Sequence, residues 1–265
     1  MTADCFLELD DVHVDLPVLD AHQRSFKQSL LRLGGGRLAD RGGGMVVRAL
    51  QGVSLRLQAG DRVALVGFNG SGKTTLLRVM AGILEPMQGR VRSRGRVVAL
   101  FDALLGIDPD LNAYDNIALR GALLGLSDAE IARELPEIER FTELGAYLRL
   151  PVRTYSKGML MRLGFAISTA VRPDILLIDE VLAAGDIQFN RRAEARLAET
   201  LGSSGIAVIC SHGPNLLRQF CTSGVYMEEG RVALSGALEP VLGRYTDLRA
   251  AGAPARMAPP LAAVR

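Results

Sequence analysis

The stretch Val63–Thr75, VALVGFNGSGKTT, decides the fold of this chain. It opens with four apolar residues, as a buried strand does, and an apolar helical pattern follows it from Leu76 to Met80. Between the two lies the spacing G-x-x-x-x-G-K-T, which is typical of a glycine-rich loop joining a strand to a helix. In such a loop several backbone N–H groups point at one anion, and the positive end of the helix dipole adds to the attraction. The stretch therefore predicts a phosphate-binding loop.

The side chains of this loop indicate that the phosphate belongs to a nucleotide. Lys73 reaches the β- and γ-phosphates, and the Thr74 hydroxyl can ligate Mg²⁺. The chain has only three lysines, so a lysine at 73 indicates a need for a compact ammonium group on a flexible stem. An ordinary glycine-rich turn is the alternative explanation. The predicted nucleotide ligands are Gly67, Phe68, Asn69, Gly70, Ser71, Gly72, Lys73, Thr74 and Thr75.

The composition is that of a soluble globular protein. Of 265 residues, 48% are apolar and 23% charged, and the formal net charge of +2 gives no general argument for nucleic-acid binding. The three cysteines, Cys5, Cys210 and Cys221, lack metal-ligand spacing and are expected to be reduced thiols. No run approaches the roughly 20 apolar residues that span a membrane, and the acidic N-terminus does not resemble a signal peptide. We therefore expect a cytosolic protein that reaches a membrane only through a partner.

The N-terminal part contains an excursion between two strand patterns. Phe6–Leu16 alternates apolar and polar residues and predicts a strand at a sheet edge, whereas Val46–Leu57 returns to strand patterning. Between them, residues from about 20 to 45 form a predicted insertion with two glycine runs and the basic stretch Arg24–Leu33. Periodicity alone leaves two interpretations open, a flexible insertion and a short amphipathic docking helix.

Helix signals dominate the middle of the chain. Residues from about 112 to 172 form an α-rich lobe, in which Ser127 opens a helix with the spacing of a capping box. The apolar runs Ile175–Ile178 and Ile206–Cys210 then have the character of strands buried on both faces of a parallel sheet. The predicted fold class is α/β, a P-loop NTPase core with a mixed or parallel sheet and an inserted α-helical subdomain. The Ala- and Pro-rich tail, 248–265, is predicted to be disordered.

Polar residues that end the predicted strands complete the site. In open parallel sheets ligands bind at the carboxyl ends of strands, so groups far apart in sequence meet there. Asp179 suits Mg²⁺, Glu180 is placed to orient or deprotonate the attacking water, and His212 can hydrogen-bond the γ-phosphate. A turn, a helix cap or a solvated histidine would explain each residue singly. Their coincidence with a phosphate loop favours a catalytic role for Glu180 and His212.

Four blocks of sequence, in this order, resemble those of ABC-type ATPases: GFNGSGKTT, YSKGMLMRL at 155–163, ILLIDEVLAAGD at 175–186 and SH at 211–212. The resemblance covers roughly residues 5–247, so an ATP-binding domain is expected over 1–247. The segment TYSKGMLMRLGFAISTA, followed by DEVLAAGD, resembles the corresponding sequences of the subfamily that exports lipid-linked polysaccharides such as O-antigen, capsule or teichoic acid.

This resemblance implies ATP and Mg²⁺ as cofactors and ATP hydrolysis coupled to transport. It implies a homodimer in which Ser156 and Gly158 cap the γ-phosphate bound to the other subunit, as a second helix N-terminus aimed at one anion. It also implies a separate transmembrane permease, a lipid-linked polysaccharide as the transported substrate, and a peripheral position on the cytoplasmic face of the inner membrane.

Two positions depart from the family pattern. Asp102 stands where a glutamine usually links the nucleotide to the membrane partner, and its shorter carboxylate can still bind Mg²⁺ or its water. Leu16 stands where an aromatic residue usually stacks on adenine, so that stacking is weak or comes from another residue. The alternative functions are an ABC subunit for another cargo, such as a lipid, drug or small solute, and a soluble ABC-type ATPase that acts outside transport.

Overall fold

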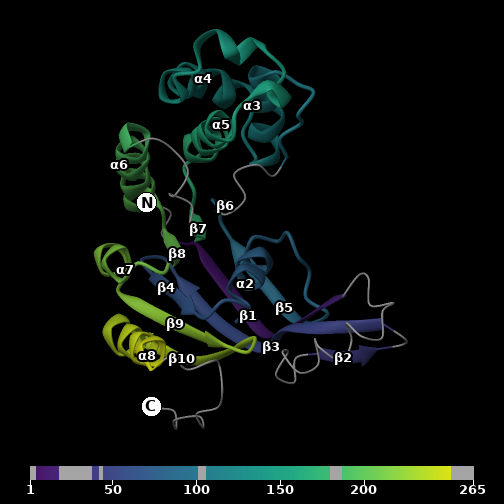
Figure 1. Ribbon diagram of the computed structural model, residues 1–265, viewed down its shortest axis with the longest axis vertical. Helices are drawn as coiled ribbons and strands as arrows, with labels where there is room; N and C mark the ends of the chain where they lie inside the picture. Colours follow the sequence, from purple (N-terminus) through teal and green to yellow (C-terminus); the bar gives the residue numbers. More distant parts are fainter. Residues whose placement is uncertain (1–3, 18–37, 42–43, 101–105, 180–186, 252–265) are drawn as a thin grey trace. The chain divides into compact units, whose positions relative to one another are not determined.

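The computed structural model describes residues 4–17, 38–41, 44–100, 106–179 and 187–251 (Figure 1). The chain divides into two compact units. The P-loop unit consists of Phe6–Ser93 and Val208–Arg265, and the helical unit consists of Met1–Cys5 and Arg94–Ala207. The α-rich lobe predicted at about 112–172 lies inside the helical unit, whereas the stretch Arg24–Leu33 lies outside the described residues. Of the predicted disordered tail 248–265, residues 248–250 are helical and residues 252–265 lie outside the described residues.

The first sheet of the P-loop unit has the strand order β2-β3-β1-β5. β1 and β3 are antiparallel, with Phe6 opposite Gln58, and β2 pairs antiparallel with β3. Part of the predicted insertion is therefore a strand of this sheet. The four strands are β1 (Phe6–Pro17), β2 (Leu38–Arg41), β3 (Gly44–Gln58) and β5 (Gln88–Arg94).

β1 is an inner strand, and the prediction that Phe6–Leu16 lies at a sheet edge is wrong. The strand buries Leu7, Leu9, Val12 and Val14, whereas the residues between them are half-buried or exposed. Alternation thus reports that one face of the sheet is solvated. Antiparallel sheets commonly have one solvent-exposed face. Apolar and polar residues therefore alternate along their inner strands as clearly as along their edge strands.

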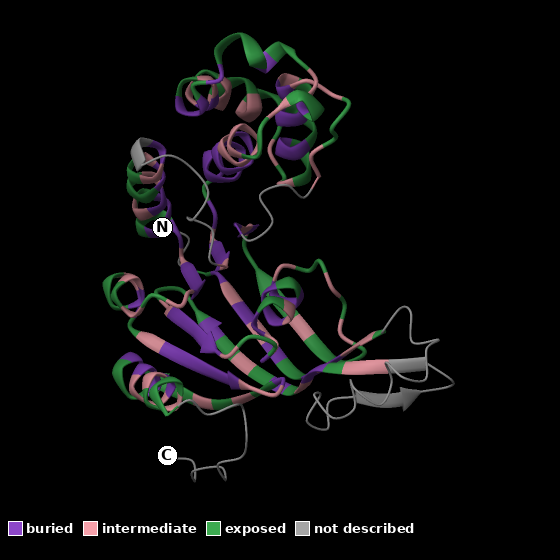
Figure 2. Ribbon diagram, in the orientation of Figure 1, coloured by how far each residue is buried: buried purple, intermediate pink, exposed green. Residues whose placement is uncertain are grey.

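The second sheet contains the P-loop stretch. β4 (Arg62–Gly67) is parallel to β9 (Ser223–Glu228), and β9 is antiparallel to β10 (Arg231–Ala237). On the other side of β4 in the strand order is β8 (Ile206–Cys210), in which every residue is buried. Five of the six residues of β4 are also buried, so the strand that leads into the phosphate loop is fixed by core packing (Figure 2).

Within its described residues, the P-loop unit also contains the helices α2 (Lys73–Met80), α7 (Pro214–Phe220) and α8 (Leu238–Ala250). α8 packs closely on β9, because a Cβ atom at Gly224 of this strand would lie 2.9 Å from the Val241 side chain. Leu238, Val241, Leu242 and Tyr245 form the buried face of α8 at helical spacing.

The helical unit contains the helices α3 to α6 and a short parallel strand pair. The helices are α3 (Ala113–Leu123), α4 (Asp128–Thr142), α5 (Lys157–Ala170) and α6 (Ile187–Ser203), the strands β6 (Val97–Ala99) and β7 (Ile175–Asp179), and the 3₁₀ turns η1 (Gly145–Arg149) and η2 (Val152–Thr154). The predicted capping box is confirmed: the Ser127 hydroxyl accepts from the Glu130 amide, and the Glu130 carboxylate accepts from the Ser127 amide at 2.8 Å.

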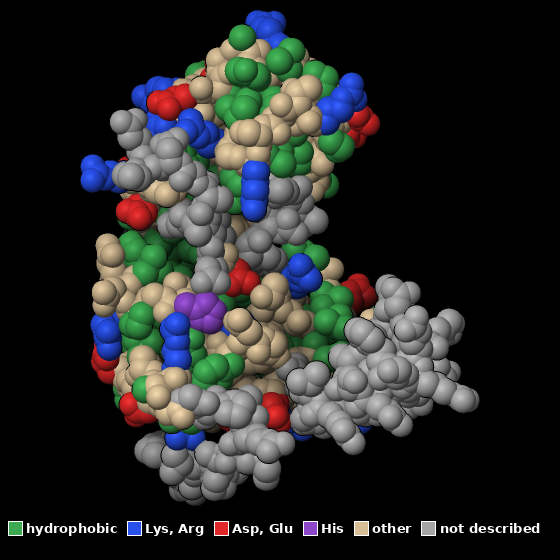
Figure 3. Space-filling view, in the orientation of Figure 1, with side chains coloured by type: hydrophobic (Ala, Val, Ile, Leu, Met, Phe, Trp, Pro, Cys, Tyr) green, Lys and Arg blue, Asp and Glu red, His purple; other side chains and the backbone are tan. Residues whose placement is uncertain are grey.

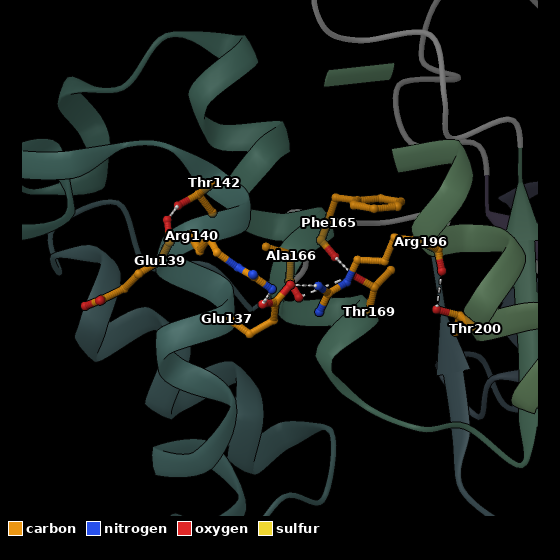
Figure 4. A network of polar contacts seen from close by, with 9 residues as sticks. All are labelled: Glu137, Glu139, Arg140, Thr142, Phe165, Ala166, Thr169, Arg196 and Thr200. Atoms are coloured by element: carbon orange, nitrogen blue, oxygen red, sulfur yellow. Dashed lines mark hydrogen bonds and ion pairs between the residues drawn. The ribbon is translucent and has the colours of Figure 1, made fainter. Parts of the chain in front are cut away.

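Side chains rather than backbone groups hold α4, α5 and α6 together (Figure 4). Arg196 of α6 donates to the Glu137 carboxylate of α4 at 2.7 Å and to the Thr169 hydroxyl of α5 at 2.9 Å. Its guanidinium carbon also lies 4.9 Å from the centroid of the Phe141 ring. Phe141 packs against Phe165 and Phe189, so one aromatic residue comes from each helix.

The charges of this network favour its ionised form. Burial raises the pKa of the Glu137 carboxyl, but the hydrogen bonds and positive charges of Arg140 and Arg196 outweigh it and leave that pKa below its usual value. A second pair has the same design, because Arg192 of α6 donates both terminal nitrogens to the Glu143 carboxylate at the end of α4.

Interspersed surface charges and buried cysteines are both typical of a globular protein. On the face shown in Figure 3, the acidic and basic side chains of the helical unit are interspersed. All three cysteines are buried thiols outside any disulfide, and burial raises the pKa of the Cys221 thiol to about 12. Within the described ranges, no helix combines the length and apolar character needed to cross a membrane.

Candidate nucleotide-binding site

The phosphate loop is formed by backbone conformations that favour glycine. Gly67, Gly70 and Gly72 have φ angles of 154°, 77° and 105°. A Cβ atom would lie 2.4 Å from the Met227 carbonyl oxygen at Gly67 and 2.7 Å from the Ala49 carbonyl oxygen at Gly72. The loop thus follows the neighbouring backbone too closely for a side chain at either glycine.

Two backbone hydrogen bonds join Ser71 of the loop, through Gly230, to Gln51. The Gly230 amide donates to the Ser71 carbonyl at 2.9 Å, and the Gln51 amide donates to the Gly230 carbonyl at 2.8 Å. Gly230 belongs to the tight turn between β9 and β10, where Glu229 and Gly230 both have positive φ. The shape of the loop is therefore held in part by a turn that lies about 160 residues further along the sequence.

Lys73 holds its ammonium group over this loop. The side chain is 8% exposed, and Nζ donates to the carbonyl oxygens of Gly67 at 2.7 Å and Phe68 at 3.0 Å. An ammonium group has three donors, so these two bonds leave one for a phosphate oxygen. The Ser71 hydroxyl oxygen is also buried and has no hydrogen-bond partner in the part of the chain that the structure describes. A nucleotide phosphate fits this set of donors.

His212 lies in the same unit, directly after β8. Its Nδ1 atom is 2.8 Å from the hydroxyl of Tyr245 in α8. The Tyr245 ring in turn lies 5.9 Å, centroid to centroid, from the ring of Phe68 in the phosphate loop. Tyr245 therefore contacts both His212 and the loop. Its spacing from Leu238, Val241 and Leu242 predicts a buried helix position, but no motif marks this tyrosine as part of a site.

The helical unit carries the other described candidates. The Ser156 hydroxyl caps α5 by accepting from the Met159 amide at 3.3 Å, which leaves its own hydrogen available to a phosphate. Gly158 lies in the first turn, where an added Cβ would meet only the Ser156 hydroxyl, at 3.9 Å. Asp179 is the last residue of β7. Glu180 and Asp102 fall outside the described residues, so their predicted roles stay predictions.

Two described residues are candidates to hold Mg²⁺ together with the phosphates. Among the described residues, no cluster of three or more His, Cys, Asp or Glu side chains could hold a metal. Thr74, at the start of α2, and Asp179 are the described candidates, and Mg²⁺ usually binds through one or two protein ligands together with substrate phosphates and water. A hydroxyl and a carboxylate are residue types that suit Mg²⁺; Thr74 belongs to the P-loop unit and Asp179 to the helical unit.

Leu16, the position predicted to lack the adenine-stacking aromatic, lies in β1 opposite Val47. It is half-buried. An aliphatic side chain there can cover a base face only through apolar contact, so a weak stacking interaction at this position remains the prediction.

Comparisons with known proteins agree with this geometry. The family model described as "ABC transporter" matches residues 50–183. The O-antigen export system ATP-binding protein RfbE of Yersinia enterocolitica is 43% identical over 84% of this chain and 94% of its own length. The corresponding RfbB protein of Myxococcus xanthus is 37% identical over 84% of this chain and 51% of its own length. A teichoic acids export ATP-binding protein, TagH of Bacillus cereus, is 35% identical over 74% of this chain and 36% of its own length.

Solved structures show the same fold. One, titled as the ATP-binding subunit of an ABC transporter, superposes with a TM-score of 0.67 at 22% identity, over 91% of this chain and 93% of that one. A second, a dimeric ATP-binding cassette bound to ADP and phosphate, gives a TM-score of 0.64 at 20% identity, over 88% of this chain and 99% of that one. The predicted α/β fold class is thereby confirmed.

Proposed function

The chain belongs to the ABC transporter family, and we propose that it is the ATP-hydrolysing subunit of an exporter of lipid-linked polysaccharide. The observation that carries the proposal is the loop Gly67–Thr75, in which glycine backbone, the Lys73 ammonium and the buried Ser71 hydroxyl all lie ready for an anion. The cargo is inferred from the relatives, whose names specify O-antigen and teichoic acid export.

Each site residue has a distinct role in this proposal. The loop amides and Lys73 hold the β- and γ-phosphates, and Thr74, Asp179 and Asp102 hold Mg²⁺ or its water. Bound Mg²⁺ supplies positive charge that offsets the charge developing on the phosphate oxygens. Glu180 orients or deprotonates the attacking water, and His212 donates a hydrogen bond to the γ-phosphate.

A homodimer would complete each site. The N-terminus of α5, with the Ser156 hydroxyl hydrogen and the Gly158 backbone, offers donors to an anion, and the helix dipole adds to the attraction. We propose that these groups cap the γ-phosphate bound to the P-loop of the other subunit. Binding of two ATP molecules would then close the dimer, and hydrolysis would reopen it.

A separate permease would form the membrane passage. Two turns of α3 expose Leu119 and Leu123, which are four residues apart and therefore lie on the same face of the helix. Large exposed apolar side chains that lie together often mark a contact surface. We propose that this surface meets the permease at the cytoplasmic face of the inner membrane.

The nucleotide part of the proposal is tested by Lys73→Ala. Removing the ammonium should weaken binding of ATP with Mg²⁺ by about 10- to 100-fold, because a hydrogen bond to a charged group is lost. Arg78→Ala is the matched control, since Arg78 is an exposed cation of the same helix. Isothermal titration calorimetry measures both, and unchanged affinity in Lys73→Ala would overturn the assignment of the loop.

The cargo is tested in cells of the source organism that lack the gene. We expect surface polysaccharide to be lost and its lipid-linked precursor to accumulate, with recovery on expression of the wild type but not of Lys73→Ala. Normal surface polysaccharide together with retention of another solute would favour the alternative cargo. No transport defect at all would favour the soluble ATPase.

A further inference from the structure

One buried tyrosine joins three segments around the phosphate loop. Tyr245 of α8 is 3% exposed, and its ring lies 5.9 Å from Phe68 of the loop and 6.4 Å from Tyr226 of β9, centroid to centroid. Its hydroxyl oxygen is 2.8 Å from Nδ1 of His212, and the two ring planes are inclined by only 28°. Packing therefore fixes the ring, and the hydroxyl is held against one particular nitrogen of His212.

The backbone around Tyr245 leaves this ring little freedom. α8 lies so close to β9 that even a methyl group at Gly224 would press on Val241. The neighbouring residues Leu242 and Val241 are each 1% exposed. A rigid ring carrying a polar atom is a precise way to set the orientation of a second side chain, because its own rotamer is determined by packing.

The contact is compatible with two positions of the imidazole proton, because a tyrosine hydroxyl can donate or accept. In a neutral imidazole one nitrogen donates and the other accepts, and the bond made by one nitrogen determines the role of the other. When the Tyr245 hydroxyl donates to Nδ1, that nitrogen carries no hydrogen, and the ring proton is on Nε2. A phosphate oxygen accepts hydrogen bonds, so only a protonated Nε2 can serve it.

We propose that Tyr245 is a positioning residue for ATP hydrolysis, which keeps His212 in the Nε2-protonated form and holds its ring beside the phosphate loop. The proposal rests on the function proposed above for His212, a hydrogen bond to the γ-phosphate. Tyr245 touches neither ATP nor water in this scheme. It acts through His212, and its ring contact with Phe68 keeps His212 at a fixed position relative to the loop.

Two matched variants isolate the hydroxyl. Tyr245→Phe removes one oxygen atom and keeps the ring that packs against Phe68. Tyr226→Phe makes the same change on the adjacent ring, whose hydroxyl is also buried. Any effect of removing a buried phenol oxygen as such would appear in both variants.

The first readout is the ¹⁵N NMR spectrum of the histidine side chains. The chain has three histidines, and His212→Ala identifies the signal of His212 by its loss. We expect the Nε2-protonated form in the wild type and in Tyr226→Phe, and a mixture of the two forms in Tyr245→Phe. Protonation at Nδ1 in the wild type would overturn the proposal.

The second readout is steady-state ATP hydrolysis with parallel binding of ADP. We expect Tyr245→Phe to lower kcat about 3- to 10-fold, the size of effect that follows from losing one hydrogen bond. ADP lacks the γ-phosphate, so its affinity should be unchanged, and Tyr226→Phe should behave as the wild type. A purely structural role for the hydroxyl would instead lower ADP binding and the melting temperature together.

The outcomes separate this proposal from the role of His212 on which it rests. Reduced hydrolysis in His212→Ala, with normal hydrolysis in Tyr245→Phe, would overturn the Tyr245 proposal alone. Normal hydrolysis in His212→Ala would overturn the proposed role of His212 and the catalytic consequence of Tyr245 with it. Reduced kcat in both variants, together with the expected shift of the imidazole proton, would support it.

Discussion

The P-loop unit and the helical unit hold their functional segments by different means. In the P-loop unit the phosphate loop is fixed by backbone, through the bonds of Gly230 to Ser71 and Gln51 and through glycines that admit no side chain. In the helical unit α5 and α6 are fixed by side chains, with arginines paired to glutamates and placed over phenylalanine rings. Close backbone packing requires glycines at fixed positions, so it can be recognised as a pattern in the sequence. The arginine network consists of charged residues with no regular spacing, so no pattern identifies it.

The same difference extends to the interior of each unit. The core of β4 and β8 is an unbroken run of apolar side chains, whereas the helical unit buries Arg120, which is 3% exposed and donates to the Ser168 hydroxyl at 2.6 Å. Removing one member of a buried polar network leaves its partners without hydrogen bonds, so the helical unit should respond to substitution of paired polar side chains as well as of apolar ones. Four predictions test and refine this contrast.

The largest expected effect is on hydrolysis. Glu180→Gln should keep ATP binding, which the backbone loop of the P-loop unit provides, and should lower hydrolysis by about 10²- to 10⁴-fold, because a positioned base is lost. The variant should also accumulate as an ATP-bound dimer. Phosphate release and size-exclusion chromatography measure the two properties. If the Glu180→Gln variant hydrolyses ATP at the wild-type rate, Glu180 is not the catalytic base.

The next effect compares stability in the two units. Leu65→Ala in the apolar core of the P-loop unit should cost about 2–5 kcal/mol, through lost burial and a cavity. Arg196→Ala should cost about 1–3 kcal/mol, because it leaves the Glu137 carboxylate and the Thr169 hydroxyl without their donor. Urea denaturation measures both free energies of unfolding.

Arg191→Ala serves as the control for Arg196→Ala, because Arg191 is an exposed arginine on the same helix. It should change stability by less than about 0.5 kcal/mol. Equal costs for Arg191→Ala and Arg196→Ala would show that the network adds nothing to stability. A cost for Arg196→Ala above that of Leu65→Ala would reverse the contrast between the units.

A smaller effect concerns pH. The folded pKa of Glu137 lies below its usual value of 4.5, so its ionised form stabilises the fold above that value, and the contribution is lost as pH falls through the folded pKa. The side chain is 32% exposed, which limits the gain to about 1 kcal/mol or less. The difference in unfolding free energy between the wild type and Glu137→Gln should therefore be constant near neutral pH and shrink below about pH 4.5. A difference that grows in acid would contradict this assignment.

The smallest effect on stability is expected for Asp102 and the stretch Arg24–Leu33. Deletion of Arg24–Leu33 should leave the unfolding free energy within roughly ±0.5 kcal/mol, as surface changes usually do, and Asp102→Ala should leave the protein folded and able to bind ATP. Both should still lower polysaccharide export, since we expect these segments to serve coupling to the permease. Surface polysaccharide in cells, beside the melting temperature and ATP affinity of purified protein, tests this. If the deletion unfolds the protein, Arg24–Leu33 belongs to the core. If both the Asp102→Ala variant and the deletion variant export polysaccharide normally, the coupling hypothesis is wrong.

The P-loop was predictable because its constraints are local. Strand, glycines, lysine and helix follow one another within Val63–Thr75, and the structure places β4 and α2 on either side of the loop. The capping box at Ser127 was predictable for the same reason, since its two partners are three residues apart. Family likeness supplied the roles of Ser156 and Gly158, which no local rule implies.

The rest depends on contacts between distant residues. Tyr245 and His212 are 33 residues apart, and Arg196 and Glu137 are 59 apart, with nothing in either neighbourhood to single out the pair. β1 was misplaced because alternation indicates which face of a sheet is wet, whereas the number of neighbouring strands depends on where β5 returns. Long-range pairing of this kind follows from the fold as a whole.

The bond between Gly230 and Ser71 has a consequence for biosynthesis. The phosphate loop lies in the first third of the chain, but the turn that fixes its outer side is made about 160 residues later. A nascent chain that has left the ribosome only as far as the helical unit has the whole loop sequence and lacks this support. The backbone support of the phosphate loop is therefore complete only once residue 230 has been synthesised.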